Sequence, residues 1–174
     1  MNDLQADGAA EPERAVPERI SITTRREYLD AFDALLAGAQ RELYLFDPDL
    51  EQLQLNTPAR NEALAAFLRR NALTRLQIVV HDDRYLAHHC PRFAELAALF
   101  STNVAIRRTE GDAARAQDCF VVADAADCVR RPVAAQVRGV ILRNDPNETA
   151  LMLERFSQIW DSSTPAAPPT TLGI

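Results

Sequence analysis

Strand-like and helix-like segments alternate along most of this chain, and this alternation restricts its fold more than any other feature. Short β-type runs at residues 20–23, 43–46, 76–80 and 104–107 are separated by stretches whose apolar residues recur at helical spacing. Strands that alternate with helices form a sheet whose two faces are covered by helices. We therefore expect one α/β domain with a mixed, largely parallel sheet flanked by helices on both faces.

Helix starts are marked by local signals. Thr24-Arg-Arg-Glu27 is a capping box, and Thr57-Pro58, Cys90-Pro91 and Asp145-Pro146 place proline in a first turn, where its missing N–H costs nothing. The last helix carries large apolar side chains on one side, which we assign to the core rather than to a stacking platform: Met152, Phe156, Ile159 and Trp160. Residues 120–123, 128–133 and 137–142 are predicted to be three successive strands before it.

The two ends of the chain differ from its middle in composition. Residues 1–18 are acidic and lack apolar periodicity, which predicts a disordered tail, and the Pro/Thr-rich residues 164–174 predict a second flexible tail. The folded domain is expected to span residues 19–163.

No apolar run approaches the roughly 20 residues of a membrane helix, so we expect a cytoplasmic protein without a membrane partner. The net charge of −6 argues against nucleic acid as a partner.

Four strings in the folded part, in this order, resemble one catalytic half of the phospholipase D superfamily. They are Leu43-Tyr-Leu-Phe-Asp-Pro-Asp49, Leu76-Gln-Ile-Val-Val-His-Asp82, Cys119-Phe-Val-Val-Ala-Asp124, and Arg138-Gly-Val-Ile-Leu-Arg-Asn-Asp-Pro146 with the helix that ends at Trp160. The resemblance covers residues of about 20 to 163 and implies a phospholipase D-like fold. It also implies a homodimer, because active members with a single half pair two copies across a cleft.

The catalytic signature of that superfamily, His-x-Lys-x-x-x-x-Asp, is degenerate here. Alignment on Asp124 places Gln117 at the position of the nucleophilic histidine and Cys119 at that of the phosphate-binding lysine. All 19 basic residues of the chain are arginine, so no lysine can take over that role. The resemblance therefore implies a pseudoenzyme: a non-catalytic bacterial relative that needs no cofactor and acts as a binding or interaction module.

The identity of a partner stays open at this point. Similar half-domains accompany acetyltransferase domains in bacteria, and this chain shows no acetyl-CoA-binding loop, so an acetyltransferase would be a separate partner protein. An unidentified protein or a small anionic ligand are the other candidates. Arg130 and Arg131 could bind an anion because the planar guanidinium suits phosphate. Neighbouring acids, including Asp118 and Asp127, favour instead a solvated, ion-paired surface.

Every histidine of the chain lies within ten positions, which gives an alternative candidate site. His81, Asp82, His88, His89 and Cys90 offer ligands for a divalent metal or a relocated catalytic histidine, and they would make the chain a divergent phosphodiesterase or nuclease. Their spacing matches no established zinc pattern, so a polar loop with a helix cap is the favoured interpretation and no metal is predicted. Asp47 and Asp49 are similarly assigned to a turn rather than to an acid/base pair.

Overall fold

The computed structural model describes residues 16–166 and contains one eight-stranded sheet. The strand order across the sheet is β1-β7-β6-β5-β2-β3-β4-β8. Along the chain the elements are β1 (Glu18–Ile22), α1 (Arg25–Gly38), β2 (Glu42–Asp47), α2 (Pro58–Arg69), β3 (Arg75–Val80), α3 (Arg84–His89), α4 (Pro91–Leu99), β4 (Val104–Thr109), the 3₁₀ helix η1 (Gly111–Arg115), β5 (Cys119–Ala123), β6 (Asp127–Arg131), β7 (Gly139–Arg143), α5 (Pro146–Asp161) and β8 (Ser163–Pro165).

The sheet is mixed, as expected, but its parallel part is small. β2, β3 and β4 pair in parallel because α2, and then α3 with α4, carry the chain back to the same edge between them. The remaining described pairs, β1–β7, β2–β5, β4–β8, β5–β6 and β6–β7, are antiparallel. The expectation of a largely parallel sheet therefore holds only for β2–β3–β4, since β5, β6 and β7 follow one another as an antiparallel meander.

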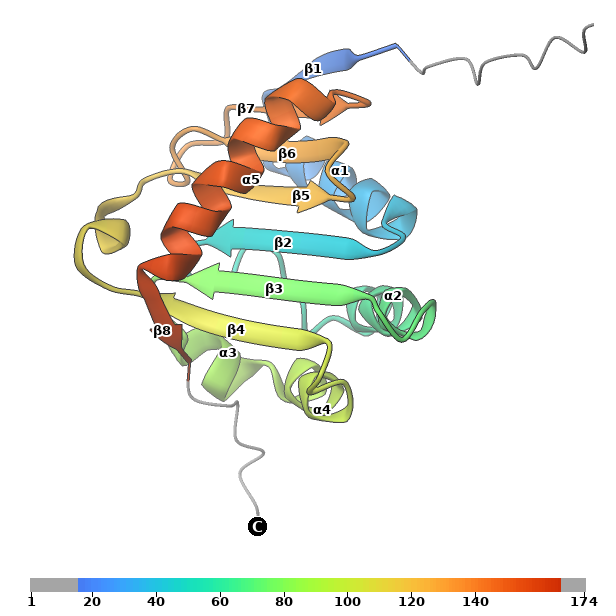
Figure 1. Cartoon of the computed structure of the whole chain (residues 1–174), viewed down its shortest axis with the longest axis vertical. Helices are drawn as coiled ribbons and strands as arrows, with labels where there is room; N and C mark the ends of the chain where they lie inside the picture. Colours follow the sequence, from blue (N-terminus) through green and yellow to red (C-terminus); the bar gives the residue numbers. More distant parts are fainter. Residues whose placement is uncertain (1–15, 167–174) are drawn as a thin grey trace, which may run out of the picture.

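Helices cover both faces, which confirms the expected layers. In Figure 1, α5 crosses one face diagonally, and α1, α2 and α4 lie behind the sheet. The larger apolar cluster lies on the α1 side and includes Leu45, Ile78 and Val121, all buried. The smaller cluster lies under α5 and includes Phe46, Phe120 and Phe156. Alternate residues of β2 and β5 thus enter opposite cores.

The predicted helix starts are present. Thr24 and Glu27 form the capping box of α1: the Thr24 hydroxyl accepts from the Glu27 N–H, and the Glu27 carboxylate accepts from the Thr24 N–H at 3.0 Å. These bonds, with those from Thr23, lower the pKa of Glu27. Pro58, Pro91 and Pro146 each lie in the first turn of their helix.

The edges of the folded part differ from the sequence expectation. Residues 163–165 form β8, which pairs with β4, so Thr164 and Pro165, which the sequence assigned to a flexible tail, belong to the sheet. Glu18, expected in the N-terminal tail, begins β1. The other tail residues, 1–15 and 167–174, lie outside the described residues. Within residues 16–166, no helix is long and apolar enough to cross a membrane.

Candidate functional site

The degenerate signature lies at the edge of the sheet where β2 ends and β5 begins. Cys119 pairs with Arg131 of β6, and the β2–β5 register places Asp47 on its other side. Neighbouring residues in register point to the same face of a sheet. Asp47, Cys119 and Arg131 therefore form one row of polar side chains facing α1, where apolar side chains fill the rest of the layer.

The two motif positions occupy different environments. Cys119 is the first residue of β5 and is fully buried, whereas Gln117 lies two residues before the strand and is exposed. The main chain of Gln117 is tied down, because its carbonyl oxygen accepts from the Ala134 N–H at 2.6 Å. Gln117 therefore does not share β5 with Cys119, since β5 starts only at residue 119.

Cys119 is held as a neutral thiol. Burial raises its pKa to about 11, and the nearby Asp47 carboxylate adds to the effect. Its Sγ accepts a hydrogen bond from Nε of Arg131 at 3.3 Å and lies 3.8 Å from the Tyr28 hydroxyl. A buried thiol of high pKa is a poor nucleophile at neutral pH.

Asp124, the third motif position, has a role in the fold. Its carboxylate accepts from three successive backbone N–H groups, those of Gln40, Arg41 and Glu42, at 2.6, 2.8 and 3.0 Å. These residues join α1 to β2. Asp124 thereby fixes the start of β2 next to the β5–β6 turn, where its own backbone is left-handed with a φ of 51°.

Arg131 is the largest side chain that is fully buried among the described residues, with 2% of its surface exposed. Besides its contact with Cys119, it donates from Nη1 to the Gln52 side-chain oxygen at 2.8 Å, and its Cζ lies 4.1 Å from the centre of the Tyr28 ring. Gly139 makes room for it on the next strand: a Cβ there would lie 2.6 Å from the Arg130 carbonyl oxygen and 3.0 Å from Cγ of Arg131. The guanidinium is therefore fixed from several sides.

Asp47 closes a turn, as the sequence predicted for Asp47 and Asp49. Its Oδ1 accepts from the N–H groups of Asp49 and Leu50 at 3.2 and 2.8 Å, and the backbone of Leu50 is left-handed with a φ of 65°. The other oxygen, Oδ2, is buried and has no hydrogen-bond partner within residues 16–166. Burial raises the pKa of Asp47. The turn leads into a loop whose buried Leu50 and Leu53 flank Gln52 and hold it over Arg131.

A pocket of about 350 Å³ lies beside this row, at the end of β6. Arg155 of α5 donates to both carboxylate oxygens of Asp118 at 2.6 Å. Arg130 contacts the Met152 sulfur at 3.6 Å. The lining residues are Gln117, Asp118, Arg130, Arg131, Pro132, Met152 and Arg155. Sequence reasoning pointed to Arg130 and Arg131, but it missed Arg155 and Gln52, which come from distant elements.

The structure brings together only part of the histidine cluster: Asp82, His88 and His89 line one pocket, and His81 and Cys90 lie outside it. Nε2 of His81 donates to the Ala116 carbonyl oxygen at 2.8 Å, because a carbonyl oxygen only accepts, and Nδ1 shares a hydrogen bond of 2.7 Å with the Thr109 hydroxyl. Both ring nitrogens are thus occupied under α5. His88 and His89 are exposed on α3. Cys90 is buried, and burial raises its pKa to about 11.

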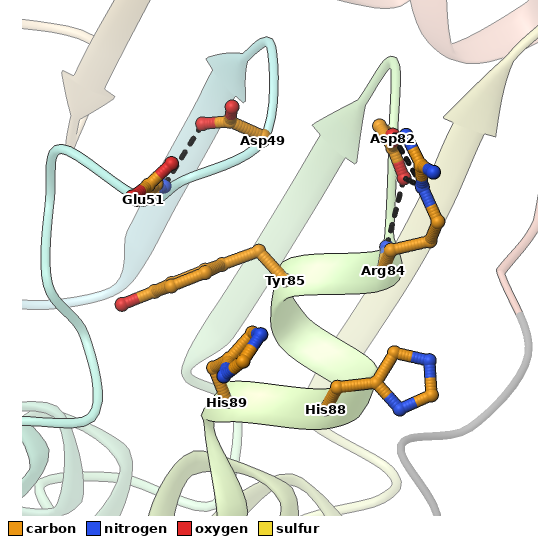
Figure 2. Close-up of a pocket in the computed structure, with 7 residues that line it drawn as sticks. All are labelled: Asp49, Glu51, Asp82, Arg84, Tyr85, His88 and His89. Atoms are coloured by element: carbon orange, nitrogen blue, oxygen red, sulfur yellow. Dashed lines mark hydrogen bonds and ion pairs between the residues drawn. The ribbon is translucent and has the colours of Figure 1, made fainter.

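A second pocket, of about 420 Å³, contains the two exposed histidines (Figure 2). The Tyr85 ring lies 5.6 Å from that of His89 and extends toward Glu51, and His88 points to the other side. Asp49 and Glu51 come from the loop after β2. In the part of the chain that the structure describes, no three histidine, cysteine or acidic side chains are placed to hold a metal ion.

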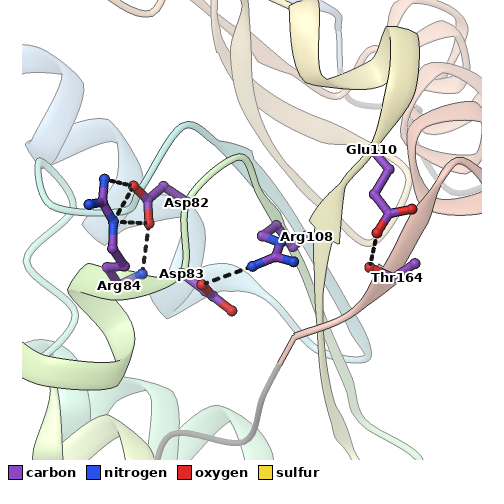
Figure 3. Close-up of polar contacts among 6 residues, drawn as sticks. All are labelled: Asp82, Asp83, Arg84, Arg108, Glu110 and Thr164. Atoms are coloured by element: carbon purple, nitrogen blue, oxygen red, sulfur yellow. Dashed lines mark hydrogen bonds and ion pairs between the residues drawn. The ribbon is translucent and has the colours of Figure 1, made fainter.

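Arginines engage the acids beside this second pocket (Figure 3). Arg84 binds both oxygens of Asp82, which lowers the pKa of that carboxyl to about 2. Nη1 of Arg108 lies 3.8 Å from Oδ1 of Asp83. Asp82 is therefore an ion-pair partner here rather than a ligand that faces His81.

The fold resembles solved structures at low sequence identity. Nuc from Salmonella typhimurium, a phospholipase D family member, is 14% identical, with a TM-score of 0.59 over 87% of this chain and 99% of that one. NucT from Helicobacter pylori is 10% identical, with a TM-score of 0.57 over 87% and 100%. TrmBL2, an archaeal chromatin protein, is 13% identical, with a TM-score of 0.62 over 90% of this chain and 56% of that one. The implied phospholipase D-like fold is confirmed.

A comparison of the sequence with curated proteins finds no match. Residues 24–168, which include nearly all of the described sheet and helices, match the family described as Domain of unknown function (DUF7931). This match covers well over half of the chain, and the protein therefore belongs to the DUF7931 family.

Proposed function

We propose that this chain is a non-catalytic phospholipase D-like domain that acts as a binding or interaction module. The observation that carries the proposal is the environment of Cys119, which is fully buried at the edge where the signature lies. Its thiol has a pKa raised to about 11, and the exposed Gln117 carries an amide, which is not a nucleophile. Loss of a covalent nucleophile from a catalytic group can lower a rate by about a millionfold.

Three kinds of partner suit such a module. A small anionic ligand suits the arginine-rich pocket at the end of β6. A second copy of the chain is proposed from the pairing of single-half members of the superfamily. A separate protein, such as a bacterial acetyltransferase, is the third. All three are proposed for a cytoplasmic protein.

Nucleic acid is not among the proposed partners. The structure of TrmBL2 shows a novel mode of DNA binding, and the fold alone connects that protein to this chain. The net charge of −6 disfavours a duplex, whose phosphates attract basic surfaces. A gel-shift assay with duplex DNA at low salt should show no complex.

The proposal is tested by assaying purified protein on bis(p-nitrophenyl) phosphate, phospholipid and DNA, with added divalent metals. The expected result is no turnover above buffer for the wild type, for Gln117→Ala, or for the double variant His88→Ala and His89→Ala. Turnover that survives Gln117→Ala but disappears in the histidine variants would establish a phosphodiesterase at the other pocket instead.

A further inference from the structure

Two leucines protrude at the edge of the sheet where β2, β3 and β4 begin, which we call the amino edge. Leu73 is 80% exposed in the turn before β3, and Leu99 is 71% exposed at the end of α4. The turns that carry them are neighbours, because β3 and β4 pair in parallel. Nδ2 of Asn103 joins the two turns by donating to the carbonyl oxygens of Ala72 and Thr74 at 3.0 and 2.8 Å. The two leucines therefore belong to one surface.

The turn that carries Leu73 is held firmly in place. The Leu73 N–H donates to the side-chain oxygen of Asn71 at 2.9 Å. The Thr74 hydroxyl lies 3.1 and 2.9 Å from the carbonyl oxygens of Leu68 and Asn71. A leucine on a rigid turn loses little conformational freedom when another segment covers it, and covering it removes apolar surface from water.

Exposed arginines surround Leu73. Arg69 and Arg70 end α2, and Arg75 begins β3. The Arg75 N–H donates to the carbonyl oxygen of Arg41 at 2.8 Å, which places Arg41 beside this group. Arg70 also donates to two carbonyl oxygens at the end of α1. Within residues 16–166, none of the four arginines forms an ion pair.

Two acids at the same part of the amino edge offset this charge only in part. The Asp124 carboxylate accepts from three backbone N–H groups. Glu42 pairs in register with Arg75 across β2 and β3. Four guanidinium groups and two carboxylates leave the edge around β2 and β3 positive, although the whole chain has a net charge of −6.

Residues 1–15 of the same chain match this surface in chemistry. They contain Leu4, one arginine and four acids: Asp3, Asp7, Glu11 and Glu13. The chain also enters the sheet at the right place. Four successive antiparallel pairs lead from β1 through β7, β6 and β5 to β2, so β1 runs in the same direction as β2 and begins at the amino edge.

The N-terminal segment is long enough to reach the leucines. β3 lies five strands from β1 in the sheet, which is about 24 Å at roughly 4.8 Å per strand. The chain from Leu4 to Val16 can span up to about 40 Å when it is extended. Leu4 and the neighbouring acids can therefore contact the turns before β3 and β4 while residue 18 stays in β1.

We propose that residues 1–15 cover the amino edge, with Leu4 against Leu73 and Leu99 and the acids beside the arginines. The inference goes beyond the proposed function and does not depend on it. Each ion pair at such an exposed site contributes little, so the contact depends on several charges together with the burial of the leucines. An acidic segment of a partner protein that binds this surface has to displace the N-terminal segment.

Paramagnetic relaxation enhancement in the full chain tests the contact, with a nitroxide attached to Gln5→Cys. The native cysteines are all buried, so the introduced thiol is the one that reacts: Cys90, Cys119 and Cys128. The nitroxide should remove most of the amide signal intensity of residues 71–75 and 99–103. High salt should restore part of it, because salt screens exposed charges.

Charge variants separate a specific contact from simple tethering. Arg69→Ser with Arg75→Ser should restore the intensities at both turns, and Leu73→Ser should restore them in part. The matched control is Arg25→Ser with Arg26→Ser, two exposed arginines in the first turn of α1, where β1 ends rather than begins. This control should leave the broadening unchanged.

Two results would overturn the inference: absence of broadening at the two turns, or equal broadening in the two double variants. A mixed sample, in which one chain carries the nitroxide and another carries the isotope label, should show no broadening. Broadening in that sample would assign the surface to the N-terminal segment of a second copy and would overturn the contact within one chain. Phosphodiester turnover would contradict the proposed function and leave these signals as they are.

Discussion

At the scale of single residues, the side chains at two positions of the degenerate signature have structural roles. Cys119 packs its thiol against a buried guanidinium, and Asp124 binds three backbone amides. In each case the side chain forms its hydrogen bonds within the protein. These polar groups at the edges of the sheet stabilise the fold.

Asp124→Asn should destabilise the domain. The amide offers one acceptor oxygen in place of a carboxylate that accepts from Gln40, Arg41 and Glu42, so at least one backbone N–H loses its partner. We expect the free energy of unfolding to fall by roughly 2–4 kcal/mol, measured by urea denaturation. Asp112→Asn is the control, because the Asp112 side chain is 97% exposed, and an unchanged midpoint for Asp124→Asn would refute the structural role.

Asp47→Asn should change how stability depends on pH. Burial raises the pKa of Asp47 above the ordinary value of 3.8, so its protonated form is the one that folding favours. The wild type should therefore be most stable relative to Asp47→Asn below pH 3.8 and lose this advantage as pH rises through the raised pKa. Urea denaturation of both proteins across this range measures the difference. A wild-type advantage that grows with pH would contradict the assignment.

Residue patterns predicted contacts within one segment and missed contacts between segments. The capping box of Thr24 and Glu27 was readable because both partners lie within four positions. The pairing of Gln52 with Arg131 was not, because it depends on the loop after β2 folding over a strand that lies 79 positions further along the chain. Arg155 was missed for the same reason. Its partner Asp118 precedes β5, and the strands β5, β6 and β7 lie between the two residues in the chain.

At the scale of elements, α5 depends on its aromatic contacts with the sheet. Phe156 is buried, with its ring centre 5.1 Å from that of Tyr44 and 5.7 Å from that of Trp160. Arg107 of β4 donates to the Trp160 carbonyl and lies over its ring at 4.6 Å, which fixes the end of the helix. This assignment of Phe156 to the core was a sequence prediction, and it is confirmed.

Phe156→Ala should therefore lower the free energy of unfolding by about 3–5 kcal/mol, the usual cost of deleting a buried aromatic ring. Leu151→Ala on the same helix is the matched control, because Leu151 is 56% exposed and should change stability by no more than about 0.5 kcal/mol. Chemical denaturation monitored by circular dichroism compares them. Similar midpoints for the two variants would show that α5 does not pack as described.

Strong periodicity predicted the long elements, whereas short ones were missed or misplaced. α1 and α5 have apolar side chains along one side, and the strands β2 and β3 are rich in buried apolar residues. The short η1 and β8 carry no such pattern. β8 forms because it can pair with β4, which other contacts already hold. The Glu110 carboxylate, which follows β4, also accepts from the Thr164 hydroxyl of β8 at 2.9 Å (Figure 3). The direction of β5, β6 and β7 depends on turn lengths that periodicity does not report.

At the scale of the whole molecule, two pockets of opposite charge lie near one another. Asp49, Glu51 and Asp82 outnumber Arg84 in the pocket of Figure 2, whereas arginines dominate the pocket at the end of β6. Glu51 lines the first pocket, and its neighbour Gln52 contacts Arg131 of the second. A two-fold axis between the pockets would place each acidic pocket against a basic one, which is the self-complementarity that a homodimer requires.

Light scattering should therefore give the mass of a dimer at micromolar concentration. Arg130→Glu would put like charges together across the interface and should shift the protein toward monomer, whereas Arg69→Gln should not. A wild-type monomer under these conditions would remove the proposed homodimer. The non-catalytic proposal does not depend on this outcome.

The most direct test of the account follows a phosphodiester by phosphorus NMR during long incubation with purified protein. Because Gln117 is not a nucleophile and the Cys119 thiol is buried with a pKa raised to about 11, the phosphodiester signal should persist at the rate seen in buffer alone. Growth of a monoester signal that depends on protein concentration, and that Gln117→Ala leaves unchanged, would contradict the central claim that this domain binds without catalysing.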